Sequence, residues 1–143
     1  MNVIIGSDHA GYELKELIKE QLKQRGINYK DVGPFSEESV DYPDFGHQVA
    51  KEVDSGEIEK GIVICGSGNG INMTVNKYKN VRAALSWKPE IAKLAREHNN
   101  ANILTLPARF ISSEEALEIL KMFLETDFEG GRHERRVNKI AIA

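Results

Sequence analysis

The sequence predicts an α/β protein, a single three-layer α/β/α domain over residues 1–143 built on a five-stranded parallel sheet (a Rossmann-like arrangement). Two observations support this class. Short apolar runs alternate from end to end with segments of helical periodicity, which is typical of parallel sheets with helices on both faces. The chain has 143 residues, enough for one core but few for two. We expect the strand order 2-1-3-4-5.

Five apolar runs predict the strands, because such runs are short, rich in β-branched residues and followed by turn residues. They are residues 3–5, 28–32, 61–64, 81–86 and 103–106. Gly6 closes the first run, and the third ends in a segment with three glycines at alternate positions.

Segments of helical periodicity separate the strands. They are residues 13–25, 45–55, 70–78, 89–98 and a helix that opens at 112. Gly26 and Gly56 end the first two, Pro89 suits a first helical turn, and Ser112 with Glu115 has capping-box spacing. Residues 33–43 are expected to form a long loop, and residues 130–143 a basic tail after a Gly-Gly break.

Composition excludes several classes of protein. A net charge of -3 gives no general attraction to nucleic acid or to an anionic membrane surface. No apolar stretch is long enough to span a bilayer. The single cysteine cannot form an internal disulfide, which suits a reducing compartment, so we expect a cytoplasmic protein.

Polar and ionisable residues follow several of the predicted strands. Asp8 and His9 follow the first, Cys65 ends the third, His98 closes the helix after the fourth, and Arg109 follows the fifth. In parallel sheets, ligands bind beyond the carboxyl ends of the strands. We therefore expect these groups to gather on one rim of the sheet.

The segment Cys65-Gly66-Ser67-Gly68-Asn69-Gly70 is the strongest candidate for chemistry. Its glycines let the backbone turn tightly and approach a ligand, and the N–H groups at the start of the next helix can stabilise an anion. Cys65 has two interpretations: a small buried hydrophobe, or a reactive thiol favoured by the helix N-terminus. Three glycines in five residues exceed what a turn needs, which favours anion binding.

Three known glycine-loop or cysteine sites do not fit this segment. A dinucleotide fingerprint needs a glycine where Ile71 stands, and a Walker loop needs a Gly-Lys-Ser/Thr sequence that is absent. A cysteine phosphatase would need an arginine six residues after the thiol, and that position is again Ile71.

Arg132 and Arg136 are four residues apart, so a helical tail would place both guanidinium groups on one face, where they suit a phosphate. A solvated basic patch beside acidic residues is the alternative. His9 and His98 could each be structural, although imidazole is well suited to proton transfer near neutral pH.

Taken together, these motifs resemble the type B ribose-5-phosphate isomerases, within a wider family that includes galactose- and allose-6-phosphate isomerases. The resemblance runs from residue 3 to about residue 140. It rests on Ser7-Asp8-His9-Ala10-Gly11, Asp41-Tyr42-Pro43, the Cys65–Gly70 segment, residues 96–102 (REHNNAN) and residues 130–136 (GGRHERR).

The resemblance implies interconversion of ribose 5-phosphate and ribulose 5-phosphate through an enediolate, without metal or organic cofactor. It implies that Cys65 is the base and that the backbone of Gly66, Ser67, Gly68, Asn69 and Gly70, with the Ser67 hydroxyl, holds the oxyanion. His98 would open the sugar ring, assisted by Asp8 and Tyr42. Asn99 would hold sugar hydroxyls or the enediolate, and the phosphate would be bound by His9, Arg109, Arg132 and Arg136.

The resemblance also implies a homodimer or homotetramer with active sites shared between subunits, and the tail 130–143 is expected to contact a partner subunit. Two other functions stay open: a hexose-6-phosphate isomerase of the same family, and a non-catalytic sugar-phosphate-binding subunit. Some family members replace the cysteine and use a glutamate after the last glycine, where this chain has Ile71. Many have threonine in place of Ser67, and both residues carry a hydroxyl.

Overall fold

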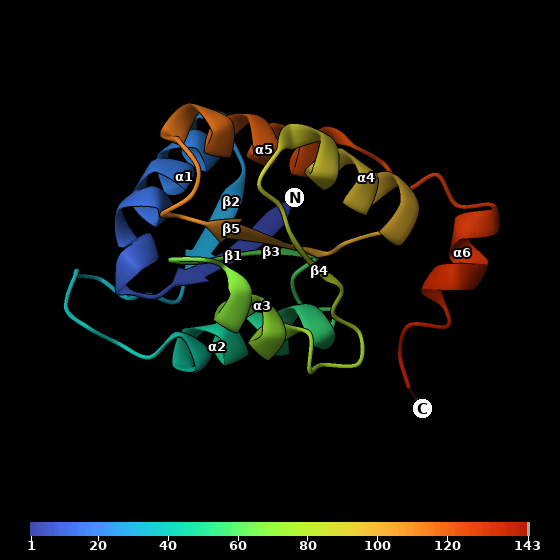
Figure 1. The fold of residues 1–143 in the computed structure, drawn as a ribbon, viewed down its shortest axis with the longest axis horizontal. Coiled ribbons are helices and arrows are strands. Elements are labelled where there is room, and N and C mark those ends of the chain that lie inside the picture. Colours follow the sequence, from blue (N-terminus) through green and yellow to red (C-terminus); the bar gives the residue numbers. More distant parts are fainter. Residues whose placement is uncertain (143) are drawn as a thin grey trace.

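Five parallel strands form one sheet in the order β2-β1-β3-β5-β4, as the computed structural model shows for residues 1–142 (Figure 1). The strands are β1 (Asn2–Ser7), β2 (Asn28–Asp31), β3 (Lys60–Cys65), β4 (Ala83–Leu85) and β5 (Ile103–Pro107). The α/β class with a parallel sheet is therefore confirmed, and all five strands lie within two residues of the predicted runs.

The predicted strand order was wrong at one edge, because β5 lies beside β3 and β4 lies outside it. Burial explains the exchange. Every residue of β5 is buried, whereas the three residues of β4 are only half-buried. A long apolar strand stabilises the centre of a parallel sheet, which is covered on both faces, and a short alanine-rich strand suits an edge.

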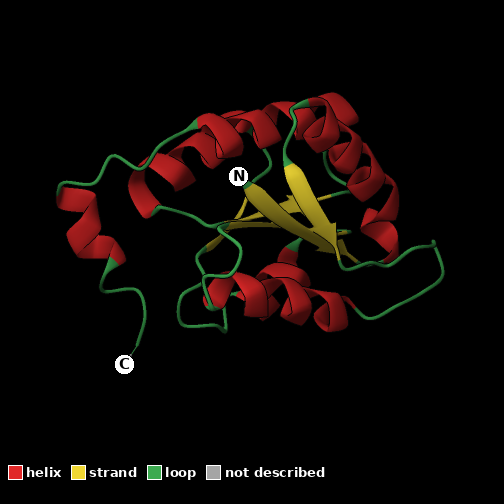
Figure 2. Ribbon diagram, turned by 180° about the vertical axis from the view of Figure 1, so that it is seen from behind, coloured by secondary structure: helices red, strands yellow, loops and turns green. Residues whose placement is uncertain are grey.

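Helices cover both faces of the sheet (Figures 1 and 2). They are α1 (Tyr12–Gln24), α2 (Tyr42–Asp54), α3 (Asn69–Val75), α4 (Pro89–Asn99), α5 (Ser113–Glu125) and α6 (Arg132–Val137), with a short 3₁₀ turn at His9–Gly11. The 3₁₀ turn was not predicted, and α3 ends at Val75, short of the predicted end. The Ser112–Glu115 capping box is present as predicted.

The handedness of the connections explains which helix lies on which face. Parallel crossovers are right-handed, so the face that a helix covers depends on the direction in which the chain moves across the sheet. The connections through α2 and α3 move one way and those through α1 and α4 the other. Accordingly α1, α4 and α5 lie together above the sheet in Figure 1, and α2 and α3 lie below it.

Two hydrophobic clusters fill the space between the layers. The first joins alternate residues of β1, β3 and β5 to α1 and α5, with Phe123 as its largest apolar side chain. The second joins the opposite face of the sheet to α2 and α3, through residues such as Val49 and Ile71, and it includes Cys65.

The C-terminal helix α6 lies apart from both layers. It packs against the end of α4, at one end of the long axis of the molecule (Figures 1 and 2). None of the helices within residues 1–142 is long and apolar enough to cross a membrane.

Candidate active site

The carboxyl ends of the three central strands bring Asp8, Cys65 and Arg109 to one edge of the sheet. The segments that follow β1 and β5 are both tied to the segment that ends β3. The N–H of Asp8 donates to the carbonyl of Ile64 (3.1 Å), and the N–H of Arg109 donates to the carbonyl of Gly66 (3.0 Å). The helices after β1, β3 and β5 depart to alternating faces, which places the loop after β3 at a switch point of the sheet, with Ser67 and Asn69 exposed.

The glycine loop after Cys65 presents free backbone donors. Gly68 has φ +80°, a left-handed conformation that favours glycine. Ser67 Oγ accepts a hydrogen bond from the N–H of Asn69 (3.2 Å). Within residues 1–142, the N–H groups of Ser67 and Gly68 donate to no other protein group, so they are available to an anion.

Two side chains lie against this loop where glycine leaves room. A Cβ on Gly66 would lie 3.3 Å from Cδ of Arg109, and a Cβ on Gly70 would lie only 2.4 Å from Cζ of Tyr42. The glycines therefore allow a guanidinium group and a phenol ring to approach the loop closely. The Arg109 guanidinium and the Tyr42 hydroxyl therefore lie beside the loop that carries the free N–H groups.

Cys65 is the last residue of β3, directly before the glycine loop. It is only 5% exposed and packs in the cluster with Ile71 and Val81. Its position at the end of β3 places the thiol beside the loop, as the sequence predicted, while its burial fits the alternative of a small hydrophobe. Both interpretations of Cys65 are compatible with these contacts.

Asp8 and His9 follow directly after β1, the strand beside β3. Asp8 is 8% exposed, and its Oδ1 accepts a hydrogen bond from the N–H of Gly11 (3.1 Å), which fixes the 3₁₀ turn. His9 Nδ1 accepts a hydrogen bond from the N–H of Val40 (3.2 Å). Since a neutral imidazole carries one proton, Nε2 of His9 is then the donor nitrogen and can bind an anionic oxygen.

The expectation that His98 shares this rim was wrong within a single chain. A helix that connects parallel strands runs back across the sheet, so the C-terminal end of α4 lies near the strands' amino ends. The carbonyl of Asn99 accepts from Nε of Arg82, just before β4, and the carbonyl of Asn102 accepts from the N–H of Gly61, at the start of β3. The strand from Gly61 to Cys65 separates the two edges by about 13 Å.

Arg132 and Arg136 lie at the far edge as well. Both belong to the exposed helix α6, so they lie four residues apart in a helical tail, the condition under which the sequence places both guanidinium groups on one face. Figure 1 shows α6 at the opposite end of the long axis from the glycine loop. The predicted site residues therefore form two groups in one chain: a carboxyl-edge group around Cys65 and a far-edge group of His98, Asn99, Arg132 and Arg136.

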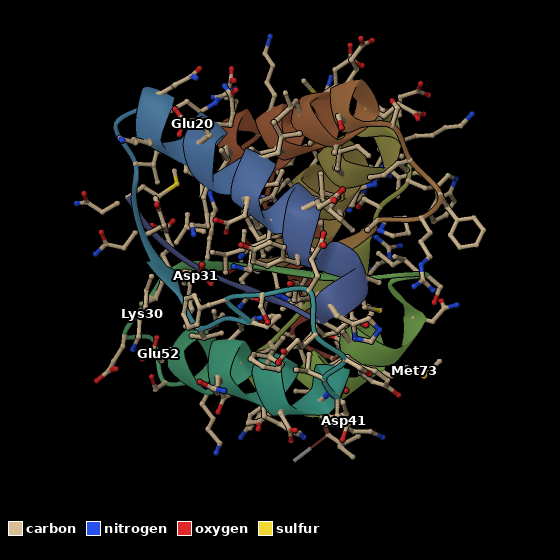
Figure 3. All side chains as sticks on the ribbon, turned by 90° about the vertical axis from the view of Figure 1, so that its left-hand side faces the viewer. Glu20, Lys30, Asp31, Asp41, Glu52 and Met73 are labelled. Carbon is tan, nitrogen blue, oxygen red and sulfur yellow. The ribbon has the colours of Figure 1, made fainter. Side chains whose placement is uncertain are left out.

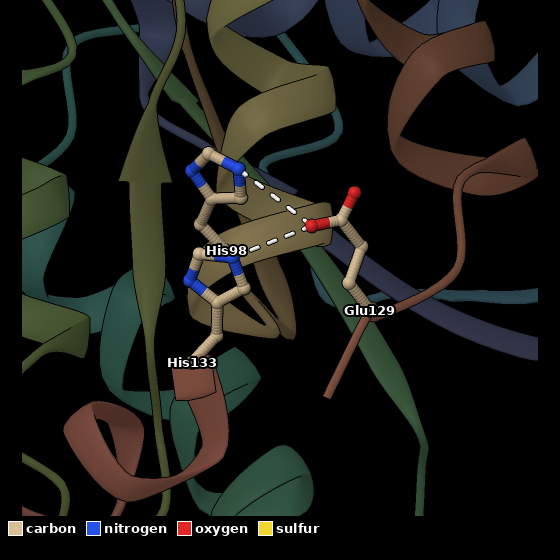
Figure 4. A group of neighbouring side chains, drawn as sticks. All are labelled: His98, Glu129 and His133. Atoms are coloured by element: carbon tan, nitrogen blue, oxygen red, sulfur yellow. Dashed lines mark ion pairs between the residues drawn. The ribbon is translucent and has the colours of Figure 1, made fainter. Parts of the chain in front are cut away.

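Sequence reasoning missed two neighbours of His98. Glu129 and His133 meet it where α6 folds back on α4 (Figure 4). Glu129 precedes the Gly-Gly break and His133 follows it, so only a helix that returns across this break brings them together. The sequence signal was their spacing of four residues, which the two intervening glycines made ambiguous.

Known proteins resemble this chain over nearly all of its length. The family described as Ribose/Galactose Isomerase matches residues 3–140. A probable ribose-5-phosphate isomerase B from Mycoplasma genitalium is 46% identical, over 97% of this chain and 93% of that protein. The solved structure of Clostridium thermocellum ribose-5-phosphate isomerase B has a TM-score of 0.96 at 50% identity, covering 98% of this chain and 95% of that one.

A second solved structure is that of the Mycoplasma genitalium ribose-5-phosphate isomerase B with bound ribulose-5-phosphate. It has a TM-score of 0.93 at 46% identity, covering 97% of this chain and 93% of that one. The match of the family over residues 3–140 and the 46% identity over 97% of the chain both exceed what a shared fold alone would give. The chain belongs to the ribose/galactose isomerase family.

Proposed function

We propose that this protein is an aldose–ketose isomerase that interconverts ribose 5-phosphate and ribulose 5-phosphate. The observation that carries the proposal is the placement of Cys65 at the end of β3, beside a glycine loop with free N–H groups, in a chain of this family. The binding of ribulose-5-phosphate by a 46% identical relative supports the choice of sugar.

Cys65 serves as the base in this proposal. Its thiolate takes the proton from C2 of the open-chain aldose, and the bonding electrons form the enediolate. The proton returns to C1 while the hydroxyl proton on O2 passes to O1, so C2 is oxidised and C1 is reduced within one molecule. A positioned base contributes roughly 10²- to 10⁴-fold to such a step.

The backbone of Gly66 to Gly70 and the Ser67 hydroxyl stabilise the developing oxyanion, a contribution of about 10²- to 10³-fold for each donor. Asp8 and Tyr42 line the sugar site beside the loop. His9 and Arg109 bind the phosphate from the carboxyl edge. The remote phosphate holds the reacting carbons in place beside the base.

His98, Asn99, Arg132 and Arg136 complete the site from a second copy of the chain. In this homodimer, the far-edge group of each subunit faces the carboxyl-edge group of the other. His98 opens the sugar ring, Asn99 holds sugar hydroxyls, and the two arginines of α6 bind the phosphate. The tail 130–143 is then an interface segment, which accounts for the projection of α6 from the body (Figure 2).

The carboxyl edge has an apolar surface that suits this interface. A groove lined by Leu85, Trp87, Pro107 and Phe110 adjoins Ser67 and Asn69 of the glycine loop. Trp87 is 49% and Phe110 74% exposed. Exposed aromatic side chains of this kind are enriched at protein interfaces and are buried there when a partner binds. Further pairing of dimers would give the tetramer.

Subunit mixing tests both the chemistry and the shared site. Cys65→Ala and His98→Ala should each lose nearly all isomerase activity. When the two variants are unfolded together and refolded, half of the dimers are mixed and each mixed dimer has one intact site. Activity should therefore return to roughly a quarter of the wild-type value. The matched control mixes Cys65→Ala with His47→Ala, a histidine on α2 outside the site.

Each outcome has one meaning. Full activity of Cys65→Ala would refute the role of Cys65 as the base, and unrestored activity in dimers shown to be mixed would refute the shared site.

A substrate panel decides between the remaining functions. Higher kcat/KM for allose or galactose 6-phosphate than for ribose 5-phosphate would make the protein a hexose-phosphate isomerase, because the family description includes galactose as well as ribose. Tight binding without turnover would make it a non-catalytic subunit. We also propose a cytoplasmic location, because a reducing compartment keeps the Cys65 thiol from oxidation.

A further inference from the structure

Three side chains from three segments converge at the end of α4 (Figure 4). His98 lies in the last turn of α4, Glu129 in the connection after α5, and His133 in the first turn of α6. Nε2 of His98 lies 3.8 Å and Nε2 of His133 lies 3.3 Å from the same oxygen, Oε1 of Glu129. Three potential metal-ligand atoms thus lie within 4.8 Å of one another.

These separations fit a tetrahedral ion of the zinc type. Zinc binds imidazole nitrogen and carboxylate oxygen at about 2.0–2.2 Å, so two ligand atoms of a tetrahedron lie about 3.3–3.5 Å apart. The His133–Glu129 separation matches this value and the His98–Glu129 separation is slightly longer. The two rings stack with centroids 4.2 Å apart and an angle of 12° between planes. One ring must therefore tilt for both lone pairs to meet at one ion.

The side chains have room for that tilt. The His98 side chain is 40% exposed and the Glu129 side chain is 50% exposed, so solvent borders both side chains and leaves space for a change of rotamer. His133 is 13% exposed and is the most firmly held of the three. A small movement of His98 toward the carboxylate is enough to close the set.

The backbone around the cluster is already fixed. The N–H of Glu129 donates to the carbonyl of Glu97 (3.1 Å), which ties the connection to the last turn of α4. The buried guanidinium of Arg96 donates to the carbonyl of Thr126 (3.0 Å), at the start of the same connection. Gly130 (φ +70°) and Gly131 (φ +55°) then turn the chain so that α6 returns toward α4. The fold, rather than chance rotamers, brings the three ligands together.

We propose that His98, Glu129 and His133 form a binding site for a divalent transition-metal ion of the zinc class, with water in the fourth position. Two imidazoles and one carboxylate form a ligand set that zinc uses where a coordination position stays open. Magnesium and calcium prefer sites made of oxygen ligands only, so they are poor occupants. Among the described residues, these three make up the whole group of His, Cys, Asp and Glu side chains at this place.

Occupation of the site has a consequence that rests on the proposed function. Here Nε2 of His98 is taken as the nitrogen that donates a proton to the ring oxygen of the sugar, and Nε2 bound to the ion carries no proton to donate. The metal ion therefore inhibits isomerisation by removing the ring-opening acid. Metal binding itself does not depend on this step, so the two claims can be tested separately.

Calorimetric titration of the full-length, chelator-treated protein with zinc chloride tests the site. We expect one zinc ion per chain in the wild type. His133→Ala and Glu129→Gln should each weaken binding by more than the roughly 10- to 100-fold that loss of an outer-shell partner costs. His47→Ala, a histidine on α2 that contacts Tyr78, is the matched control and should bind zinc as the wild type does. Circular dichroism of each variant establishes that it is folded.

Cys65 is the competing zinc ligand, because thiolates bind zinc well. We expect Cys65→Ala to retain the one-to-one binding. Binding that survives in His133→Ala and Glu129→Gln but disappears in Cys65→Ala would overturn the proposal, and so would the absence of binding at millimolar zinc. Inhibition of the wild type should reach half its maximum at the zinc Kd. Zinc that binds at the cluster without inhibiting would leave the metal site in place and refute the role of His98.

Discussion

The buried ion pair between Lys15 and Asp31 should contribute strongly to stability, and Asp31→Asn tests it. Lys15 of α1 has a fully buried side chain, and its Nζ lies 2.7 Å from Oδ2 of Asp31, whose side chain is 8% exposed. Nζ of Lys19 lies 2.8 Å from the same oxygen, and Oδ1 accepts from the N–H of Gly33 (2.8 Å). Figure 3 shows Asp31 at the end of edge strand β2, with Lys30 and Glu52 nearby.

Replacement of the carboxylate by an amide leaves the buried ammonium of Lys15 with one anionic partner, Glu16 at 3.2 Å. Removal of one member of a buried pair costs about 3–5 kcal/mol. Glu16 remains as an anionic partner of Lys15, so we expect the free energy of unfolding to fall by about 3 kcal/mol, the lower end of this range. For a domain of this size, that corresponds to a fall of roughly 10 °C in Tm.

Urea unfolding at pH 7, followed by circular dichroism at equal protein concentrations, measures the loss. Glu125→Gln is the matched control, because its carboxylate pairs with Arg25 (3.0 Å) on the surface. An exposed pair of this kind contributes at most about 1 kcal/mol. A loss in Asp31→Asn no larger than that of the control would refute the reasoning.

The same pair predicts a pH dependence. Burial raises the pKa of Asp31, but hydrogen bonds from Lys15 and Lys19 lower it by more, so its pKa is lowered in the folded protein. Stability from a group with a lowered pKa is present above its unfolded pKa, about 3.9, and is lost as the pH falls through the folded value. The difference between wild type and Asp31→Asn should therefore stay constant from pH 7 to about 5 and shrink below about pH 4.

Two further substitutions distinguish an effect on the proposed substrate site from an effect on the stability of the fold. Gly70→Ala places a methyl group 2.4 Å from Cζ of Tyr42, and the Tyr42 side chain, which is 39% exposed, can rotate away. We therefore expect a raised KM for ribose 5-phosphate with little change in Tm. A lowered Tm with an unchanged KM would contradict the role of this contact. Ser112→Ala removes the cap of α5, with an expected cost of about 1 kcal/mol. Thermal unfolding should show that loss while kcat stays the same, and a fall in kcat would contradict the purely structural role.

The elements of this fold could be predicted because each is determined by local pattern. Gly61 to Ile64 is apolar throughout and lies buried in β3, and Ser112 with Glu115 forms the cap that its spacing indicates. The order of the last two strands could not be predicted in this way, since it depends on which of them gains more from burial on both faces. The greater apolar content of residues 103–107 was the available signal.

The same distinction, between what local pattern determines and what tertiary arrangement determines, applies to the candidate site. Asp8, Cys65 and Arg109 each lie at or within two residues of the carboxyl end of a strand, so a parallel sheet brings them to one edge whatever the strand order outside the centre. His98 ends a helix instead, and its position depends on the length of that helix. Met73 shows a related limit, because it lies in α3, the helix that follows the glycine loop, yet its side chain projects into solvent (Figure 3). Proximity in the sequence to a strand end predicts the edge but not the direction of a side chain.

The geometry of a βα unit separates the carboxyl-edge group from the far-edge group of proposed site residues. A helix of 11 residues such as α4 spans about 16 Å, and a strand of six residues spans a similar length in the opposite direction. A residue at the end of the helix therefore returns to the edge at which the strand began. Rotation of side chains cannot bridge that distance. His98 can act with Cys65 only across an interface between two chains, and restoration of activity on mixing Cys65→Ala with His98→Ala distinguishes this arrangement from a role for His98 outside the reaction.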